Sequence, residues 1–154
     1  MKLYLMRHAT PEANSDGPER ALSESGLLEA TKLADFLGQG NKVKVKVILH
    51  SGKLRARQTA DMIASRLEPA PRVMEGNGLD PNADPEVWID RAITMEENVL
   101  LVGHLPHLSR LTSCLLNQDE SRETVDFPAA AMVCLSRHEE GKFLLDWKVI
   151  PELL

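Results

Sequence analysis

The sequence predicts an α/β fold, a three-layer α/β/α sandwich with a mostly parallel central sheet and a C-terminal antiparallel strand pair. Short apolar runs typical of buried strands alternate with segments whose apolar residues recur at helical spacing. This alternation is typical of parallel βαβ units joined by right-handed crossovers, with helices on both faces of the sheet. Two final apolar runs flank Glu139-Glu140-Gly141 and indicate a hairpin. No repeat or linker divides the chain, so we expect one domain over residues 1–154.

The N-terminal half begins with four apolar residues that run into Arg7 and His8. A short apolar run of this kind predicts a strand buried on both faces. Ser23 is suited to cap a following helix, which we expect Gly38 and Gly40 to end. Alternating Val and Lys predict a half-exposed strand whose lysines shield a sheet edge. The expected elements are a strand over 3–6, a polar loop over 9–22, a helix over 24–37, a strand over 42–50 and a helix over 53–67.

The C-terminal half contains the most apolar strand, which ends at His104 just as the first strand ends at His8. Pro106 suits the first turn of the helix that follows. The expected elements are a brief strand over 72–74, a loop over 75–85, a helix over 86–95, a strand over 99–103, a helix over 106–116, a polar loop over 117–126 and strands over 129–135 and 142–149.

Composition narrows the functional classes. The formal net charge of −5 argues against general nucleic-acid binding, and an aromatic content of 4% leaves little for base stacking. Cys114 and Cys134 lie in apolar stretches without a CxxC partner, so we interpret them as reduced thiols. No segment has the length of a membrane span or of a secretory signal. These features favour a cytoplasmic protein.

Cationic and imidazole side chains follow three of the predicted strands at the point where each ends. Because the carboxyl ends of parallel strands meet at one edge of a sheet, we expect these groups to share one rim. Helix starts near Ser51 and Pro106 would direct backbone N–H groups toward the same rim. Arginine forks and helix N-termini suit a compact, multiply charged anion, above all phosphate. The groups are Arg7 and His8, then His50, Ser51 and Arg55, and finally His104.

Three motifs, in this order, resemble those of the histidine phosphatase superfamily, also called phosphoglycerate-mutase-like. They are Arg7-His8-Ala9, the segment from Ser51 to Ala60 (SGKLRARQTA) and Gly103-His104-Leu105-Pro106. The short chain, the HLP sequence and Leu79-Asp80-Pro81 are similar to the SixA-type phosphohistidine phosphatases of that superfamily. Two departures stand out. Ala9 occupies a position where glycine is usual, and Gly52 one where proline is usual; neither removes a charge, so we expect the site to persist.

The resemblance implies that His8 attacks phosphorus, forms a phosphohistidine and is regenerated by water. It implies that Arg7, Arg55 and a protonated His104 hold the phosphoryl oxygens, where charge is concentrated in phosphoryl transfer. Arg20 resembles a second pocket arginine of the SixA type, and we expect Ser51 to line the same pocket. The arginines would supply the positive charge, so we expect no metal and no cofactor. The H-x-x-H spacing of His104 and His107 lacks a third ligand for zinc.

The leaving-group acid and the substrate stay open at this point. Asp80, Glu75 and Glu12 are candidates for the general acid, although each is also a plausible solvated loop carboxylate. A phosphohistidine on a protein is the first choice of substrate, because an imidazole leaving group needs little acid assistance. The alternatives are a phosphatase of a small phosphomonoester and a non-catalytic phosphate-binding module. A mutase is disfavoured, since the chain has little room for a closed site.

Overall fold

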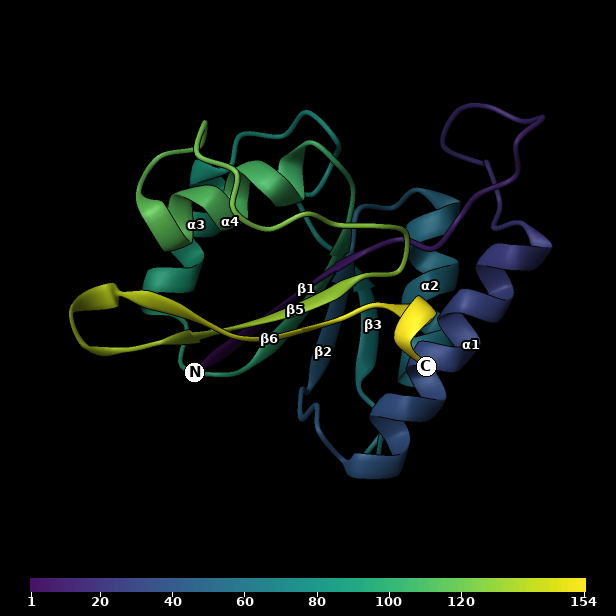
Figure 1. Ribbon diagram of the computed structural model, residues 1–154, viewed down its shortest axis with the longest axis horizontal. Helices are drawn as coiled ribbons and strands as arrows, with labels where there is room; N and C mark the ends of the chain where they lie inside the picture. The colour runs from purple at the N-terminus through teal and green to yellow at the C-terminus, as the bar shows by residue number, and fades with distance from the viewer.

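A computed structural model describes all 154 residues and contains one six-stranded sheet in the order β3-β2-β4-β1-β5-β6 (Figure 1). The first four strands are mutually parallel, while β5 and β6 run antiparallel. The predicted mixed sheet with its C-terminal antiparallel pair is therefore confirmed. The strands are β1 (Lys2–Arg7), β2 (Val47–His50), β3 (Arg72–Glu75), β4 (Val99–Gly103), β5 (Met132–Arg137) and β6 (Phe143–Val149).

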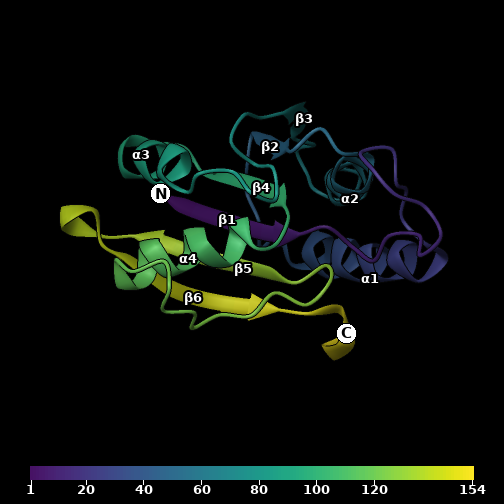
Figure 2. The same ribbon diagram turned by 90° about the horizontal axis from the view of Figure 1, so that it is seen from above.

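Helices cover both faces of the sheet, which gives the three predicted layers (Figure 2). Along β1, Tyr4 and Met6 pack into the cluster formed with α1 and α2, while Leu3 and Leu5 pack into the cluster formed with α3 and α4. This alternation explains why a strand with a period of two reads as a continuous apolar run. The helices are α1 (Glu24–Gly40), α2 (Leu54–Ala64), α3 (Glu86–Thr94) and α4 (His107–Asn117).

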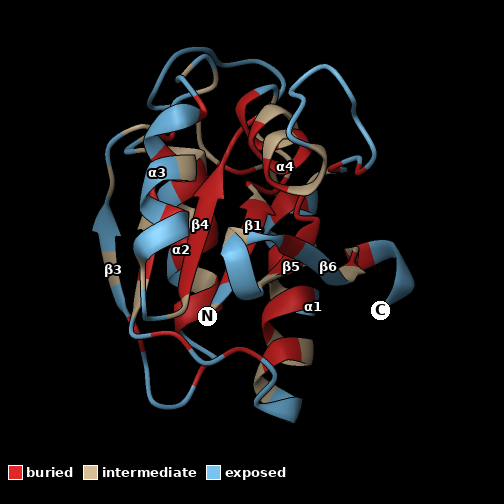
Figure 3. Ribbon diagram, turned by 90° about the vertical axis from the view of Figure 1, so that its left-hand side faces the viewer, coloured by how far each residue is buried: buried red, intermediate tan, exposed pale blue.

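Burial differs strongly between the centre of the sheet and its β3 edge (Figure 3). Every residue of β4 is buried, whereas β3 is largely exposed. None of the helices combines the length and apolar character that crossing a bilayer requires.

The α1 helix is longer than predicted, because Gly38 lies within it and the helix continues to Gly40. Ser23 caps its N-terminus as expected, accepting a hydrogen bond from Gly26 N–H at 3.1 Å. Gly38 instead permits α1 to approach the chain just beyond α2, since a Cβ there would lie 2.6 Å from the carbonyl oxygen of Arg66. The helix ends at Gly40, and Asn41 terminates it in the left-handed conformation.

The predicted strand over 42–50 is wrong in its first half, because β2 begins at Val47. Val43 and Val45 are buried in the α1–α2 core while Lys44 between them and Lys42 and Lys46 on either side are exposed, so the alternation reflects burial without sheet pairing. The lysines also do not shield an edge, since β2 lies between β3 and β4.

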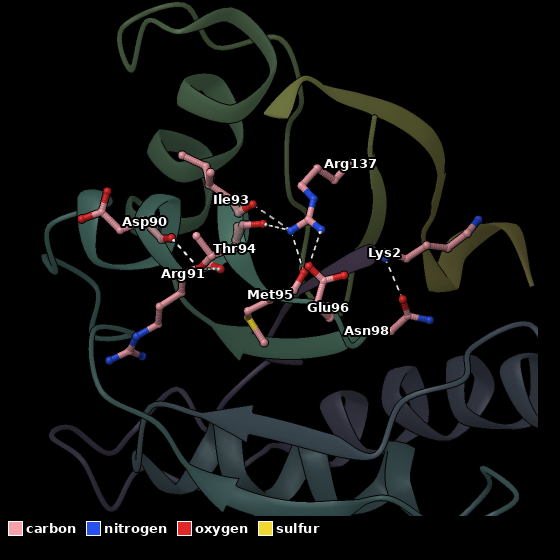
Figure 4. A network of polar contacts seen from close by, with 10 residues as sticks. Lys2, Asp90, Arg91, Ile93, Thr94, Met95, Glu96, Asn98 and Arg137 are labelled. Atoms are coloured by element: carbon pink, nitrogen blue, oxygen red, sulfur yellow. Dashed lines mark hydrogen bonds and ion pairs between the residues drawn. The ribbon is translucent and has the colours of Figure 1, made fainter. Parts of the chain in front are cut away.

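The C-terminal hairpin begins three residues later than predicted and is tied to α3 by Arg137 (Figure 4). Arg137 Nη1 donates to the carbonyl oxygens of Ala92, Ile93 and Met95 at 2.9, 2.9 and 2.6 Å. These carbonyls lie at the C-terminus of α3, where backbone acceptors lack helical partners and a cation is favourable. Arg137 therefore joins the helix layer to the end of β5.

Candidate active site

The residues that follow β1, β2 and β4 meet at one rim of the sheet, as their parallel pairing requires. The His8 N–H donates to the carbonyl oxygen of Gly103 at 3.1 Å. The rings of His8 and His104 lie 4.9 Å apart between centroids, and Ser51 Oγ lies 2.6 Å from His104 Nε2. The structure thus brings together three residues that are about fifty positions apart in the sequence.

The imidazole of His8 is held as a neutral base with one nitrogen free. Its Nδ1 lies 2.7 Å from the carbonyl oxygen of Ala9, which can only accept, so Nδ1 carries the proton. The pKa of His8 is lowered to about 4, mainly by burial and also by the charges of Arg55, Arg7 and Arg20, against the opposing effect of the Ala9 hydrogen bond. The Nε2 lone pair is therefore available at neutral pH and makes no hydrogen bond within the protein.

Each of the three predicted arginines is held by one nitrogen against a loop carbonyl, which leaves other N–H groups uncommitted. Burial is the main cause that lowers the pKa of Arg7 and Arg55, although both stay charged. The buried Nε of Arg7 has no partner in the protein, and such unpaired donors are rare in native interiors. The holding contacts are Arg7 Nη1 to Phe127 O at 2.8 Å, Arg55 Nη1 to Gly17 O at 3.2 Å and Arg20 Nε to Glu12 O at 2.6 Å.

The first amide of each of the two helices at the rim is already bonded, so these two N–H groups are not free as predicted. α2 begins at Leu54, and its N–H donates to the carbonyl oxygen of Pro18 at 2.8 Å. α4 begins at His107, and its N–H donates to the carbonyl oxygen of Pro81 at 3.1 Å. These amides tie loops to the helices, and the positive charge of the rim comes from its arginine side chains.

His104 is neutral in this structure, whereas the resemblance implied a cation. Its pKa is lowered to about 3, mainly by burial, and the positive charges of Arg55 and Lys53 act in the same direction. Its Nδ1 is buried and has no partner, while Nε2 shares a hydrogen bond with Ser51. A bound phosphoryl dianion would oppose these cations and favour the protonated ring.

Sequence reasoning missed several residues that hold the His8 loop in place. Thr59 Oγ1 accepts from the Ala9 N–H at 3.1 Å, and Glu29 accepts from the N–H and the hydroxyl of Thr10 at 2.9 and 2.7 Å. Gln58 Oε1 accepts from the Leu22 N–H at 2.8 Å. The adjacent Gln and Thr in the RARQT segment were the available signal, because polar residues one turn after Arg55 face the same loop.

The departure at Ala9 is accommodated. Ala9 is fully buried in the core and its φ is not positive, so the backbone does not require glycine there. The left-handed residue next to the loop is Ala130, with φ of 59°, and its N–H donates to the His8 carbonyl oxygen at 3.2 Å.

None of the three candidate acids forms a hydrogen bond with His8 or His104. Asp80 pairs with Lys53, with Nζ and Oδ1 3.7 Å apart. Glu75 lies against Gly52, on the His50 side of the turn after β2. Glu12 makes hydrogen bonds through its backbone and not through its carboxylate: its carbonyl oxygen accepts from Arg20, and its N–H donates to the carbonyl oxygen of Ala21.

The H-x-x-H spacing of His104 and His107 also does not form part of a metal site. His107 is fully buried, and both of its ring nitrogens lack hydrogen-bond partners. No group of three or more His, Cys, Asp or Glu side chains is arranged to hold a metal ion.

Comparison with known proteins agrees with the fold and the motif order. The model of the histidine phosphatase superfamily (branch 1) matches residues 3–77. The chain is 28% identical to the phosphohistidine phosphatase SixA of Escherichia coli, over 98% of this chain and 94% of that protein. It is 34% identical to an uncharacterised protein of Picosynechococcus sp., over 70% and 68% of the two chains. The solved structure of the protein histidine phosphatase SixA with tungstate superposes with a TM-score of 0.87 at 23% identity, covering 99% of each chain.

The fold, the rim with its two histidines and arginines, and the likeness to known phosphatases together identify an enzyme of the phosphatase class. The chain belongs to the histidine phosphatase superfamily.

Proposed function

We propose that this phosphatase works through a covalent phosphohistidine on His8 and removes phosphate from phosphohistidine on a protein. One observation carries the proposal. The His8 ring is fixed as the Nδ1–H tautomer with a free Nε2, and burial together with the charges of three nearby arginines keeps it unprotonated. A phosphate-binding module would need the arginines but would not need a neutral, oriented nucleophile among them.

The reaction would proceed in two displacements. His8 Nε2 attacks phosphorus, the new N–P bond forms, and the bond to the leaving nitrogen breaks as that imidazole takes a proton from water. A water molecule then attacks the phosphoenzyme and releases inorganic phosphate and neutral His8. Arg7 and Arg55, each held through one nitrogen, would place their other N–H groups on the phosphoryl oxygens, where negative charge must be stabilised.

The environment of the carboxylates supports a nitrogen-linked substrate. An alkoxide leaving group needs a positioned acid, whereas an imidazole leaves once it is protonated. Asp80 is exposed with Oδ1 3.7 Å from Lys53 Nζ, and Glu75 is exposed on the His50 side of the turn after β2. The likeness to the E. coli enzyme named phosphohistidine phosphatase supports the same substrate class.

We also propose that the substrate protein is met in the cytoplasm. Cys114 and Cys134 are both free thiols. Burial raises the pKa of Cys134 to about 12, so this thiol is unreactive and fits a reducing compartment.

The test compares wild type, His8→Asn and His138→Asn, the last altering an exposed histidine in the terminal turn. Each is assayed with a phosphohistidine peptide and with p-nitrophenyl phosphate, and quenched samples are examined for acid-labile phosphate by intact mass. We expect His8→Asn to lose turnover by about 10³-fold or more on the peptide, with no phosphoenzyme. His138→Asn should match wild type. A His8→Asn variant that still forms phosphoenzyme would exclude His8 as the nucleophile, and a strong preference for p-nitrophenyl phosphate would favour the phosphomonoester alternative.

A further inference from the structure

The turn between β2 and α2 is closed by a hydrogen bond from the backbone to an imidazole. The Gly52 N–H donates to His50 Nδ1 at 3.0 Å. Nδ1 must therefore carry the lone pair, and the neutral ring has its proton on Nε2. His50 is buried at the end of β2, so its ring is fixed beneath the turn that it closes.

The same turn depends on glycine at position 52. Gly52 has φ of 91°, a conformation that L-residues rarely adopt and proline cannot. A Cβ at this position would also lie 2.5 Å from Oε1 of Glu75, which fills the space beside the backbone. A proline here would have no N–H to donate to His50. The turn is thus closed by the His50–Gly52 hydrogen bond, with the Glu75 carboxylate beside the glycine.

This turn carries a residue of the candidate active site. Ser51 lies between His50 and Gly52, and its Oγ is 2.6 Å from His104 Nε2. The Lys53 N–H lies 3.4 Å from the same Oγ. Ser51 therefore has its backbone fixed from one side by His50 and its side chain directed to His104 on the other.

We propose that His50 is a positioning residue of the phosphatase site, whose unprotonated Nδ1 fixes the turn so that Ser51 orients His104. The proposal rests on the proposed function for its catalytic consequence, while its geometric part concerns the turn alone. His50 does not touch the phosphoryl group in this scheme. It acts only through Gly52 and Ser51.

A protonated His50 could not serve this role, because an Nδ1–H would oppose the Gly52 N–H. The charged groups around the ring are Arg57 and Asp61 from α2 and Glu75 from β3. Burial lowers the pKa of His50, with Arg57 acting in the same direction and the two carboxylates opposing it. The turn therefore keeps its hydrogen bond at neutral pH and loses it as the pH falls through the range where His50 protonates.

Two near-isosteric substitutions separate the roles of the ring nitrogens. In His50→Asn the side-chain oxygen can take the place of Nδ1 and accept from Gly52, and it does not titrate. In His50→Gln the polar atoms reach the position of Nε2, so the acceptor for Gly52 is lost. His138→Gln, at an exposed site, controls for loss of a histidine. Each variant is measured for kcat and KM against pH, for tungstate affinity by calorimetry, and for hydrogen exchange of the Gly52 amide by NMR.

We expect His50→Gln to lower kcat about tenfold, weaken tungstate binding several-fold and expose the Gly52 amide, since small misplacements of catalytic groups are costly. His50→Asn should stay within about threefold of wild type and lose the acid-side fall in kcat that His50 causes. Equal behaviour of the Asn and Gln variants in tungstate affinity and amide exchange would overturn the proposal. If wild type hydrolyses no phosphoryl compound, the proposed function fails, while tungstate affinity and amide exchange still decide the positioning role.

Discussion

Thr59 offers a sharp test of how the His8 loop is held. Its Oγ1 accepts from the Ala9 N–H at 3.1 Å and donates to the Arg55 carbonyl oxygen at 2.8 Å. Both Thr59 and Ala9 are fully buried, so water cannot replace the hydroxyl. We therefore compare Thr59→Val, which keeps the shape and removes the acceptor, with Thr59→Ser, which keeps the acceptor and removes a methyl group.

The expected loss in the free energy of unfolding depends on which hydrogen-bonding partner of Thr59 is left without a partner. The Arg55 carbonyl keeps its helical hydrogen bond within α2, so removing the hydroxyl strands only the Ala9 N–H. A buried amide without a partner costs about 1–3 kcal/mol. Thr59→Val should thus lower the free energy of unfolding by about 2 kcal/mol, or the Tm by about 4–8 °C for a chain of this size. Thr59→Ser should cost about 1 kcal/mol for the lost methyl group.

The decisive assay is hydrogen exchange of the Ala9 amide, combined with urea unfolding and kcat on a phosphohistidine peptide. We expect Thr59→Val to lose protection at Ala9 and to lower kcat, because the adjacent His8 is no longer held. Thr59→Ser should keep both. The reasoning is refuted if Thr59→Val unfolds within about 0.5 kcal/mol of wild type and keeps Ala9 protected.

Three further predictions follow from named contacts. Arg137→Ala should lower the free energy of unfolding by about 3 kcal/mol, because three carbonyls at the end of α3 lose a charged donor, and urea unfolding with Arg137→Lys as partial rescue would check this. Burial lowers the pKa of His107 to about 4, below the ordinary 6.5, so the unfolded chain binds a proton first as pH falls and stability is lost between those values. Between pH 7 and pH 4.5 this protonation should cost wild type about 2 kcal/mol of its free energy of unfolding, and His107→Leu should remove that loss. Urea unfolding at the two pH values measures it, and an equal acid loss in the variant would contradict the prediction. Asp80→Asn should change phosphohistidine turnover by less than about threefold, since Asp80 faces Lys53; a collapsed rate with a lost basic limb would identify it as the acid.

The sequence could predict the rim of the site because two simple rules sufficed. Apolar runs marked the parallel strands, and parallel strands end at one edge, so Arg7, His8 and His104 had to be neighbours. The pairing of β1 and β2 with β4 confirms this. The same reasoning placed Arg55 just beyond the second strand, and the family resemblance added Arg20; the charges of both are among those that lower the pKa of His8.

The remaining features depend on contacts that a single segment does not reveal. Over residues 43–46 buried valines alternate with exposed lysines, because the valines pack against α1 and α2. The segment has no strand partner, and only this shows that it is not part of the sheet. At Gly38 the chain beyond α2 comes close to α1. From helix propensity alone, a glycine at this position predicts the end of a helix. The first amides of α2 and α4 bond to Pro18 and Pro81, so helix starts alone could not show whether those donors were free.

The departures from the usual family pattern acquire meaning from the same contacts. At position 9 a methyl group is buried in the core beside His8, and the backbone there does not need the positive φ that favours glycine. At position 52 glycine adopts a conformation closed to proline, and its N–H is held by an imidazole that proline could not contact. In place of the rigid ring of a proline, position 52 thus has a backbone hydrogen bond to His50 that requires this histidine to be unprotonated. Because Ser51 connects that turn to His104, a backbone change two residues from β2 can alter the pH range over which the rim is ordered.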